Sequence, residues 1–196
     1  MLIGSVNTAY SQKIRYGITG GIHAATTRRD DNGFLKNKYI FGFRTSALID
    51  YQLLENISIT SFPGISKKGY KSPNIVFNTG DFYYGIYYLE LPIYATYSYK
   101  ISTGKLFAGF GPYFGLGVSG KWGLSKMQKI EFGNTSTDKF KRGDVGLGFM
   151  AGYELPKGIQ LMLTASLGLR KIHSNPNVVP MQNRVIGLSA VYLLKK

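Results

Sequence analysis

The sequence contains many segments in which every second residue is large and apolar. One example is "GDVGLGFMAGYELPKGIQLMLTASLGLRK" (143–171), in which two such runs flank the turn "LPKG". Alternation with a period of two is typical of β-strands, because successive side chains point to opposite faces of a sheet. The intervening residues are mostly glycine, serine and threonine, so the polar face is small and almost uncharged. The pattern therefore leaves open which face is buried.

The strand segments are joined by short and long connections in strict alternation. We identify eight segments, at 13–27, 38–53, 56–70, 82–101, 105–122, 140–155, 158–171 and 183–195. The short connections are 53–56, 102–105 and 155–158, and the long ones are 28–37, 71–81, 123–139 and 172–182. In an up-and-down meander all short turns lie at one end and all long loops at the other. Outer-membrane barrels, whose strand number is even, have this layout.

We therefore predict an all-β fold, an eight-stranded antiparallel up-and-down transmembrane β-barrel in the outer membrane, with periplasmic termini. An eight-stranded barrel has an interior only just wide enough for side chains. The face of glycine, serine and threonine fits that interior, and the bulky apolar face would contact lipid. A soluble lipocalin-like barrel that holds a ligand would require the reverse arrangement.

Aromatic residues on the apolar face should form two belts, one near each end of the barrel. Such girdles mark the two membrane–water interfaces of membrane barrels. Near the short turns we expect Tyr16, Tyr51, Tyr97, Tyr99, Tyr153 and Tyr192. Near the long loops we expect Tyr39, Tyr83 and Trp122.

The small polar face also carries charged residues, which the barrel would enclose. A charge in a narrow, nearly dry interior is costly unless it is paired. Arg44 and Arg170 should neutralise Glu90 and Asp144 towards the long loops. Arg15 should meet Glu154 or Asp50 near the short turns. The functional interpretation of this lumen charge network is an ion path or gate, and the alternative, favoured by the narrow interior, is a structural plug.

The chain is strongly basic, with 24 Lys and Arg against 10 Asp and Glu. This excess favours an anionic partner such as nucleic acid, lipid headgroups or lipopolysaccharide. No nucleic-acid-binding motif is present, and many basic residues lie in or beside the long loops. We therefore expect outer-membrane lipid and lipopolysaccharide as partners, or otherwise a merely solvated loop surface. The expected anion-binding rim consists of Lys126, Lys129, Lys139, Lys141 and Arg142.

The first residues differ from the rest of the chain. Ala9 and Ser11 stand at the −3 and −1 positions of a cleavage site before Gln12. We interpret residues 1–11 as the remnant of a signal peptide, with a disordered tail as the alternative. Residues 12–196 would then form a single barrel domain. No run of about 18 apolar residues predicts a transmembrane helix.

Catalytic chemistry has little support in the sequence. There is no cysteine, and the two histidines are expected apart, with His23 inside the barrel and His173 in a loop. No spacing of serine, histidine and acid indicates a nucleophile with its base, and no metal motif is present. We expect no enzyme activity, no cofactor and no metal.

Several stretches also resemble a known family. These are "YLELPIYATY" (88–97), "FAGFGPYFGLGVSGK" (107–121), "FKRGDVGLGFMAGYEL" (140–155) and "NRVIGLSAVY" (183–192). They are similar to the outer-membrane β-barrel domain family of Bacteroidetes, whose members are called PorT-like or porin-family proteins. The resemblance implies an eight-stranded barrel of OmpA/OmpX-like shape, but no single activity. Such barrels usually end on an aromatic residue, whereas this chain ends "VYLLKK".

The sequence thus leads to two functional hypotheses, given in order of preference. The first is an integral outer-membrane barrel of the cell envelope with a structural or adhesive role, a plugged lumen and basic loops facing lipopolysaccharide. It would be a monomer. The alternative is a small porin, or a PorT-like accessory component of a protein secretion system, with envelope or secretion proteins as partners.

Overall fold

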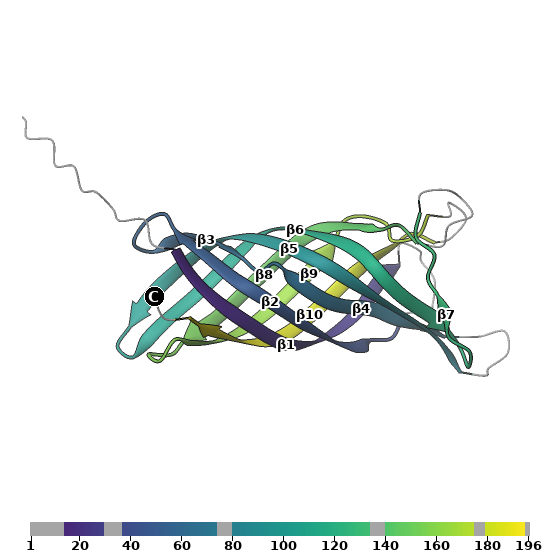
Figure 1. Ribbon diagram of the computed structural model, residues 1–196, viewed down its shortest axis with the longest axis horizontal. Coiled ribbons are helices and arrows are strands. Elements are labelled where there is room, and N and C mark those ends of the chain that lie inside the picture. Colours follow the sequence, from purple (N-terminus) through teal and green to yellow (C-terminus); the bar gives the residue numbers. More distant parts are fainter. Residues whose placement is uncertain (1–13, 30–36, 74–79, 134–139, 175–178, 195–196) are drawn as a thin grey trace, which may run out of the picture.

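The computed structural model describes residues 14–29, 37–73, 80–133, 140–174 and 179–194, which form one elongated, closed barrel (Figure 1). Residues 1–11, where we expect a signal-peptide remnant, lie outside the described residues. No helix in the described part of the chain is long and apolar enough to cross a membrane. The strands are β1 (Ile14–Arg29), β2 (Ile40–Gln52), β3 (Ile57–Ser61), β4 (Gly64–Pro73), β5 (Asp81–Ile101), β6 (Gly104–Gly123), β7 (Gln128–Lys129), β8 (Gly143–Glu154), β9 (Ile159–Gly168) and β10 (Met181–Leu193).

All neighbouring strands are antiparallel, and β1 closes the ring by pairing with β10 from Gly17↔Leu193 to Arg29↔Met181. Strands β3 and β4 together fill one position between β2 and β5. The short β7 only extends β6, so the ring has eight positions. The short turns and both described chain ends lie at one end of the barrel, and the long loops lie at the other (Figure 1). The predicted eight-stranded up-and-down barrel is confirmed.

The third position of the ring is interrupted, although the sequence pattern predicts one strand over 56–70. Phe62 and Pro63 separate β3 from β4, because a proline has no backbone N–H to give to a ladder. The flanking groups still bond: Ala47 N donates to Pro63 O at 3.0 Å, and Phe62 N donates to Pro92 O at 3.3 Å. The alternation continues across the interruption, so the Phe62 ring points into the interior, where it is 2% exposed.

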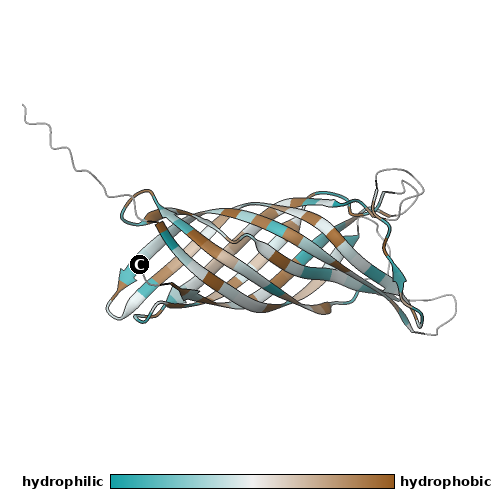
Figure 2. Cartoon of the chain, viewed as in Figure 1, coloured by the Kyte–Doolittle hydropathy of each residue, from teal (hydrophilic) through white to brown (hydrophobic). Residues whose placement is uncertain are grey.

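The large apolar face lies on the outside of the barrel. Ile22, Phe110 and Leu163 are 67%, 63% and 60% exposed, whereas the inward Leu48 and Met162 are each 1% exposed. Hydrophobic residues recur at alternate positions along the middle of the strands (Figure 2). An outward apolar band is what a lipid bilayer requires of a membrane barrel. The orientation predicted for this face is therefore correct.

The face assignment fails near the long-loop end of β6. Tyr87 pairs with Ser119 and Tyr88 with Gly117, so Val118 is an extra residue in a β-bulge. A bulge shifts the alternation by one residue. Beyond it Trp122 pairs with the inward Tyr84 and stacks on its ring at 6.0 Å between centroids. The prediction that Trp122 belongs to the outer aromatic girdle is wrong for this reason.

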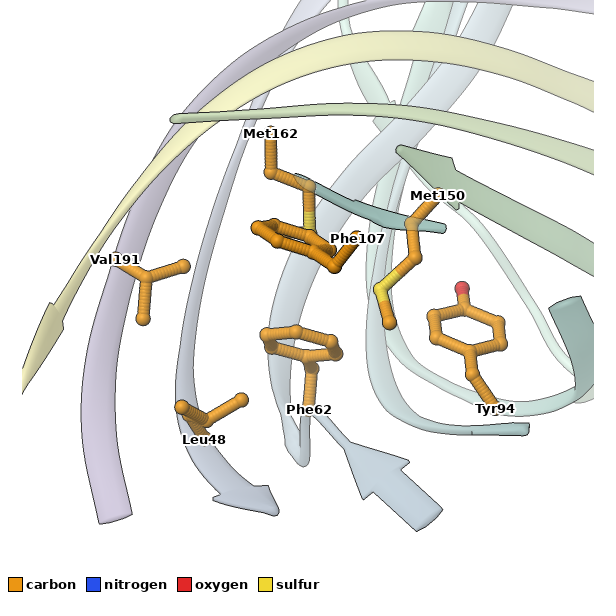
Figure 3. Packing of buried hydrophobic residues seen from close by; sticks show 7 residues of the cluster. All are labelled: Leu48, Phe62, Tyr94, Phe107, Met150, Met162 and Val191. Carbon is orange, nitrogen blue, oxygen red and sulfur yellow. The ribbon is translucent and has the colours of Figure 1, made fainter. Parts of the chain in front are cut away.

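Large side chains fill the interior as well as small ones. Figure 3 shows the central cluster, which we name the apolar layer: Leu48, Phe62, Tyr94, Phe107, Met150, Met162 and Val191. Glycines on β8 make room for these rings. A Cβ atom on Gly148 would lie 2.4 Å from the Tyr94 hydroxyl, and one on Gly152 would lie 2.5 Å from the Phe107 ring. The glycine face therefore accommodates aromatic rings that reach across from other strands.

Candidate functional site

The first charged group inside the barrel lies near the short turns, and we name it the turn-side cluster: Arg15, Asp50 and Glu154. Arg15 donates to Asp50 at 2.7 Å and to Glu154 at 2.9 Å. Thr60 donates to Asp50 at 2.8 Å and Gln160 to Glu154 at 2.9 Å. One guanidinium therefore joins carboxylates of β2 and β8 across the lumen, because different N–H groups of its planar fork donate to the two carboxylates.

This cluster forms the floor of a cavity that opens at the turn end. The cavity has a volume of about 860 Å³, and Lys100, Lys105 and Lys157 are among its lining residues. Deeper in, between the cluster and the apolar layer, the space falls to about 10 Å³. That is no more than one water molecule needs. The cavity thus ends at the turn-side cluster.

The second charged group, the loop-side cluster, consists of Arg44, Lys68, Glu90 and Asp144. It lies on the other side of the apolar layer, as the inward order Asp50, Leu48, Arg44 along β2 indicates. Lys68 Nζ bridges Glu90 and Asp144, with 3.2 Å to the latter. Arg44 lies 3.3 Å from Glu90.

Two neutral residues, Asn183 and Tyr113, complete the loop-side cluster. Asn183 donates to Asp144 at 2.9 Å and Tyr113 donates to it at 3.2 Å. The Lys68 ammonium lies 4.2 Å from the centroid of the Tyr113 ring. Lys68 is 1% exposed and Asp144 is fully buried. Two cations and two carboxylates are therefore paired in a dry environment, as burial of charge demands.

Arg170 does not take part in this cluster, so its predicted pairing with Glu90 and Asp144 is wrong. Strand β9 ends at Gly168, so Arg170 lies beyond the alternating segment, is exposed, and lies over Gly143. Lys68 instead bridges Glu90 and Asp144, the pairing predicted for Arg170. Strict alternation from the inward Ser66 would have found Lys68, but three nearby lysines made the segment resemble a loop flank.

Beyond the loop-side cluster the lumen is closed by a third layer, the loop-end cap. Tyr84 and Trp122 pack against it, and Phe140 lies 4.5 Å from His173 between ring centroids. His173 Nε2 and the Tyr70 hydroxyl are 3.0 Å apart. His23 is inside the barrel, where its Nε2 lies 2.8 Å from Lys67 O. The cap consists of Tyr70, Ile86, Tyr88, Ile130, Phe140, Ile172 and Met181.

The predicted girdle tyrosines lie on the outer wall. Near the short turns, four are exposed and Tyr51 and Tyr153 are half-buried. Near the long loops, Tyr39 is 61% exposed and Tyr83 is half-buried. The exposed four are Tyr16, Tyr97, Tyr99 and Tyr192.

Four of the five predicted rim residues lie in the described part of the chain. Lys126, Lys129 and Arg142 are exposed, and Lys141 is half-buried. The Arg142 guanidinium lies 5.8 Å from the centroid of the Phe132 ring. Lys139 lies outside the described residues. In the described part of the chain, no group of three or more histidine, aspartate or glutamate side chains could hold a metal ion.

Solved structures of other outer-membrane proteins are similar to this chain. OprG of Pseudomonas aeruginosa is 10% identical, with a TM-score of 0.50, and the match covers 93% of this chain and 95% of that one. Neisserial surface protein A is 12% identical over 90% and 96% of the two chains, with a TM-score of 0.49. Ail of Yersinia pestis, in complex with the heparin analogue sucrose octasulfate, is 12% identical over 93% and 99%, with a TM-score of 0.48. At 10% identity the likeness to OprG concerns the fold alone.

Family membership comes from the sequence comparison. Comparison with curated proteins finds no match. The family model described as "Outer membrane protein beta-barrel domain" matches residues 10–174. The match includes β1 to β9 and therefore both ion clusters. It agrees with the outward apolar band and the closed ring, and it confirms the predicted location. The chain is an outer-membrane protein that belongs to the outer membrane protein β-barrel domain family.

Proposed function

We propose that this protein is a closed barrel of the cell envelope with a structural or adhesive role, carried by its external loops rather than by transport through its lumen. The observation that carries the proposal is the layered interior. The apolar layer, the loop-side cluster and the loop-end cap lie in succession above the cavity. Conduction would require all three to move apart, and buried paired charges resist separation.

The proposal includes the domain and partner assignments. Residues 12–196 form one barrel domain after a signal-peptide remnant at 1–11, and the protein is monomeric, without enzyme activity. The basic loop residues, including the exposed Lys126, Lys129 and Arg142, face anionic lipopolysaccharide. Electrostatic attraction between cationic loops and lipid phosphates supports this assignment. The resemblance to Bacteroidetes barrels makes the PorT-like subfamily our proposed placement.

Conductance in a planar bilayer tests the closed lumen. The purified barrel should insert without opening ion-conducting steps at moderate voltage and neutral pH. A variant with a smaller apolar layer, Phe107→Ala combined with Phe62→Ala, serves as the comparison because it removes two inward rings. Regular conducting steps from the wild-type barrel would overturn the proposal.

A second candidate function, an accessory of a protein secretion system, is favoured by the cavity of about 860 Å³ at the turn end. If the termini are periplasmic, this cavity faces the periplasm and is open to a partner from that side. Photo-crosslinking residues introduced at Lys100 and Lys157, on its rim, would capture such a partner in cells. A crosslinker at Lys126, at the opposite end, is the control. Equal capture from both ends would contradict this candidate.

A further inference from the structure

One side of the barrel carries lysines on its outer wall, close to the long loops. Residues paired across a ladder share a face of the sheet. Tyr83, Gly85 and Tyr87 of β5 point outward, since the intervening Tyr84, Ile86 and Tyr88 belong to the loop-end cap or pack on it. Their ladder partners are therefore also on the outer wall. The lysines so placed, which we name the outer-wall patch, are Lys67, Lys71, Lys121 and Lys129.

Lys67 is the member nearest the apolar band. Its ammonium lies 5.7 Å from the centroid of the Tyr83 ring and 5.8 Å from that of Tyr87. Aromatic faces attract a cation at this distance, and the Tyr83 ring lies over Gly85, where a side chain would collide with it. None of the ion pairs between described residues includes Lys67. The cation is held in place without an acidic partner.

The patch lies where the wall changes from apolar to basic. On the turn side of Lys67, the outward residues of the neighbouring strands are Ile65, Leu89 and Leu116, each 41–49% exposed. On the loop side they are the other three lysines of the patch, all exposed. A lysine on the lipid face is costly at the bilayer centre and well tolerated near the interface. Tyrosines concentrate at this same interface, so Lys67 lies at headgroup height.

Among the residues that the structure describes, acidic side chains do not neutralise this surface. Asp81 already pairs with Lys38, at 2.9 Å. Glu131 is exposed just after β7, beside Lys129, and is one carboxylate beside four ammonium groups. The net positive charge at headgroup height calls for an anionic group supplied by the membrane.

We propose that the outer-wall patch binds the phosphate groups of a phosphorylated glycolipid of the outer leaflet, with Lys67 as the contact nearest the acyl chains. This deepens the proposed function, on whose external placement of the loops it rests. The site shares Lys129 with the expected loop rim and extends onto the barrel wall through Lys67, Lys71 and Lys121. Strands β4, β6 and β7, which are joined through the ladders of β5 and β6, fix the spacing of its cations, and Tyr83 and Tyr87 contact Lys67.

Binding of bisphosphoryl lipid A to the folded barrel in detergent micelles tests the site, with dephosphorylated lipid A as the parallel probe. Each lysine near a lipid surface contributes about 1 kcal/mol, so K67Q should weaken binding about fivefold. The triple variant K67Q/K121Q/K129Q should weaken it on the order of 100-fold. The matched control removes three lysines at the turn end, as K100Q/K105Q/K157Q, and should bind as the wild type does.

Three results would overturn the proposal: equal binding of both lipids, wild-type affinity in the triple variant, or an equal loss in the control. If the triple variant does not fold, K67Q, K121Q and K129Q are measured singly, and wild-type affinity in all three overturns it. Conductance keeps the two proposals apart. A conducting barrel that discriminates the two lipids would refute the closed lumen and leave this site standing. A closed barrel that does not discriminate would refute the site alone.

Discussion

The two ion clusters of the lumen use the same chemistry in different surroundings. In the turn-side cluster one arginine serves two carboxylates, at the floor of an open cavity, and the Arg15 side chain is 23% exposed. In the loop-side cluster two cations serve two carboxylates between the apolar layer and the loop-end cap. There the side chains of Lys68 and Asp144 are at most 1% exposed.

The difference indicates that the ratio of cations to carboxylates in each cluster depends on whether water can reach it. An excess carboxylate is tolerable at the floor of the open cavity, which is also lined by lysines, because solvent stabilises the unpaired charge. In a sealed layer each charge needs a partner, because desolvation is not otherwise offset. The cost of removing one partner should therefore be large in the loop-side cluster and small in the turn-side cluster.

Of the three substitutions, replacing Lys68 with methionine should lower the free energy of unfolding the most. The change removes the bridge between Glu90 and Asp144. Among the described residues of the cluster, Arg44, which contacts Glu90, is then the remaining cation. We expect a loss of about 3–5 kcal/mol in the free energy of unfolding. Urea titration in lipid vesicles, followed by the heat-modifiable gel band, measures it. A loss below about 1 kcal/mol would contradict the view that this layer is sealed.

The substitution Glu90→Gln should have an intermediate effect. It keeps the shape of the side chain but removes a charge that both Lys68 and Arg44 contact, so we expect a loss of about 1.5–3 kcal/mol. The same titration measures it. The double variant with Lys68→Met should lose less than the sum of the single losses, because the two residues share one network. Unchanged stability of the single variant would show that the loop-side cluster is not a stabilising network.

The substitution Arg15→Gln should have the smallest effect of the three. Water in the cavity can solvate Asp50 and Glu154 once the guanidinium is gone, so we expect a loss of about 1 kcal/mol or less. Lys100→Gln is the control, since its pair with Glu55 is mostly exposed. A loss as large as that of Lys68→Met would mean that solvent access does not distinguish the two clusters.

Much of the fold follows from the sequence because a membrane barrel repeats one rule along every strand. The alternation of bulky and small residues sets the outward face, and the alternation of short and long connections sets the topology. The contact of Arg15 with Asp50 and Glu154 follows from the same rule, since all three lie near short turns on inward positions.

The sequence pattern fails where the backbone departs from regular alternation. The bulge at Val118 reverses the faces beyond it, and its cause lies in pairing with β5 rather than in the local sequence. The strand over 56–70 is likewise interrupted at Pro63, and β9 ends at Gly168, before Arg170. The partner of Glu90 and Asp144 was missed because Lys68 stands in a run that reads equally well as a basic loop flank.

The bulge at Val118 has a further consequence for how this chain can vary. Without it, Trp122 would face the bilayer and Lys121 would be driven into the sealed lumen. The single extra residue thus places Trp122 against the loop-end cap and Lys121 on the outer wall. A change in the length of an external loop leaves the alternation within the strands unaltered, but a one-residue deletion here would exchange both surfaces at once.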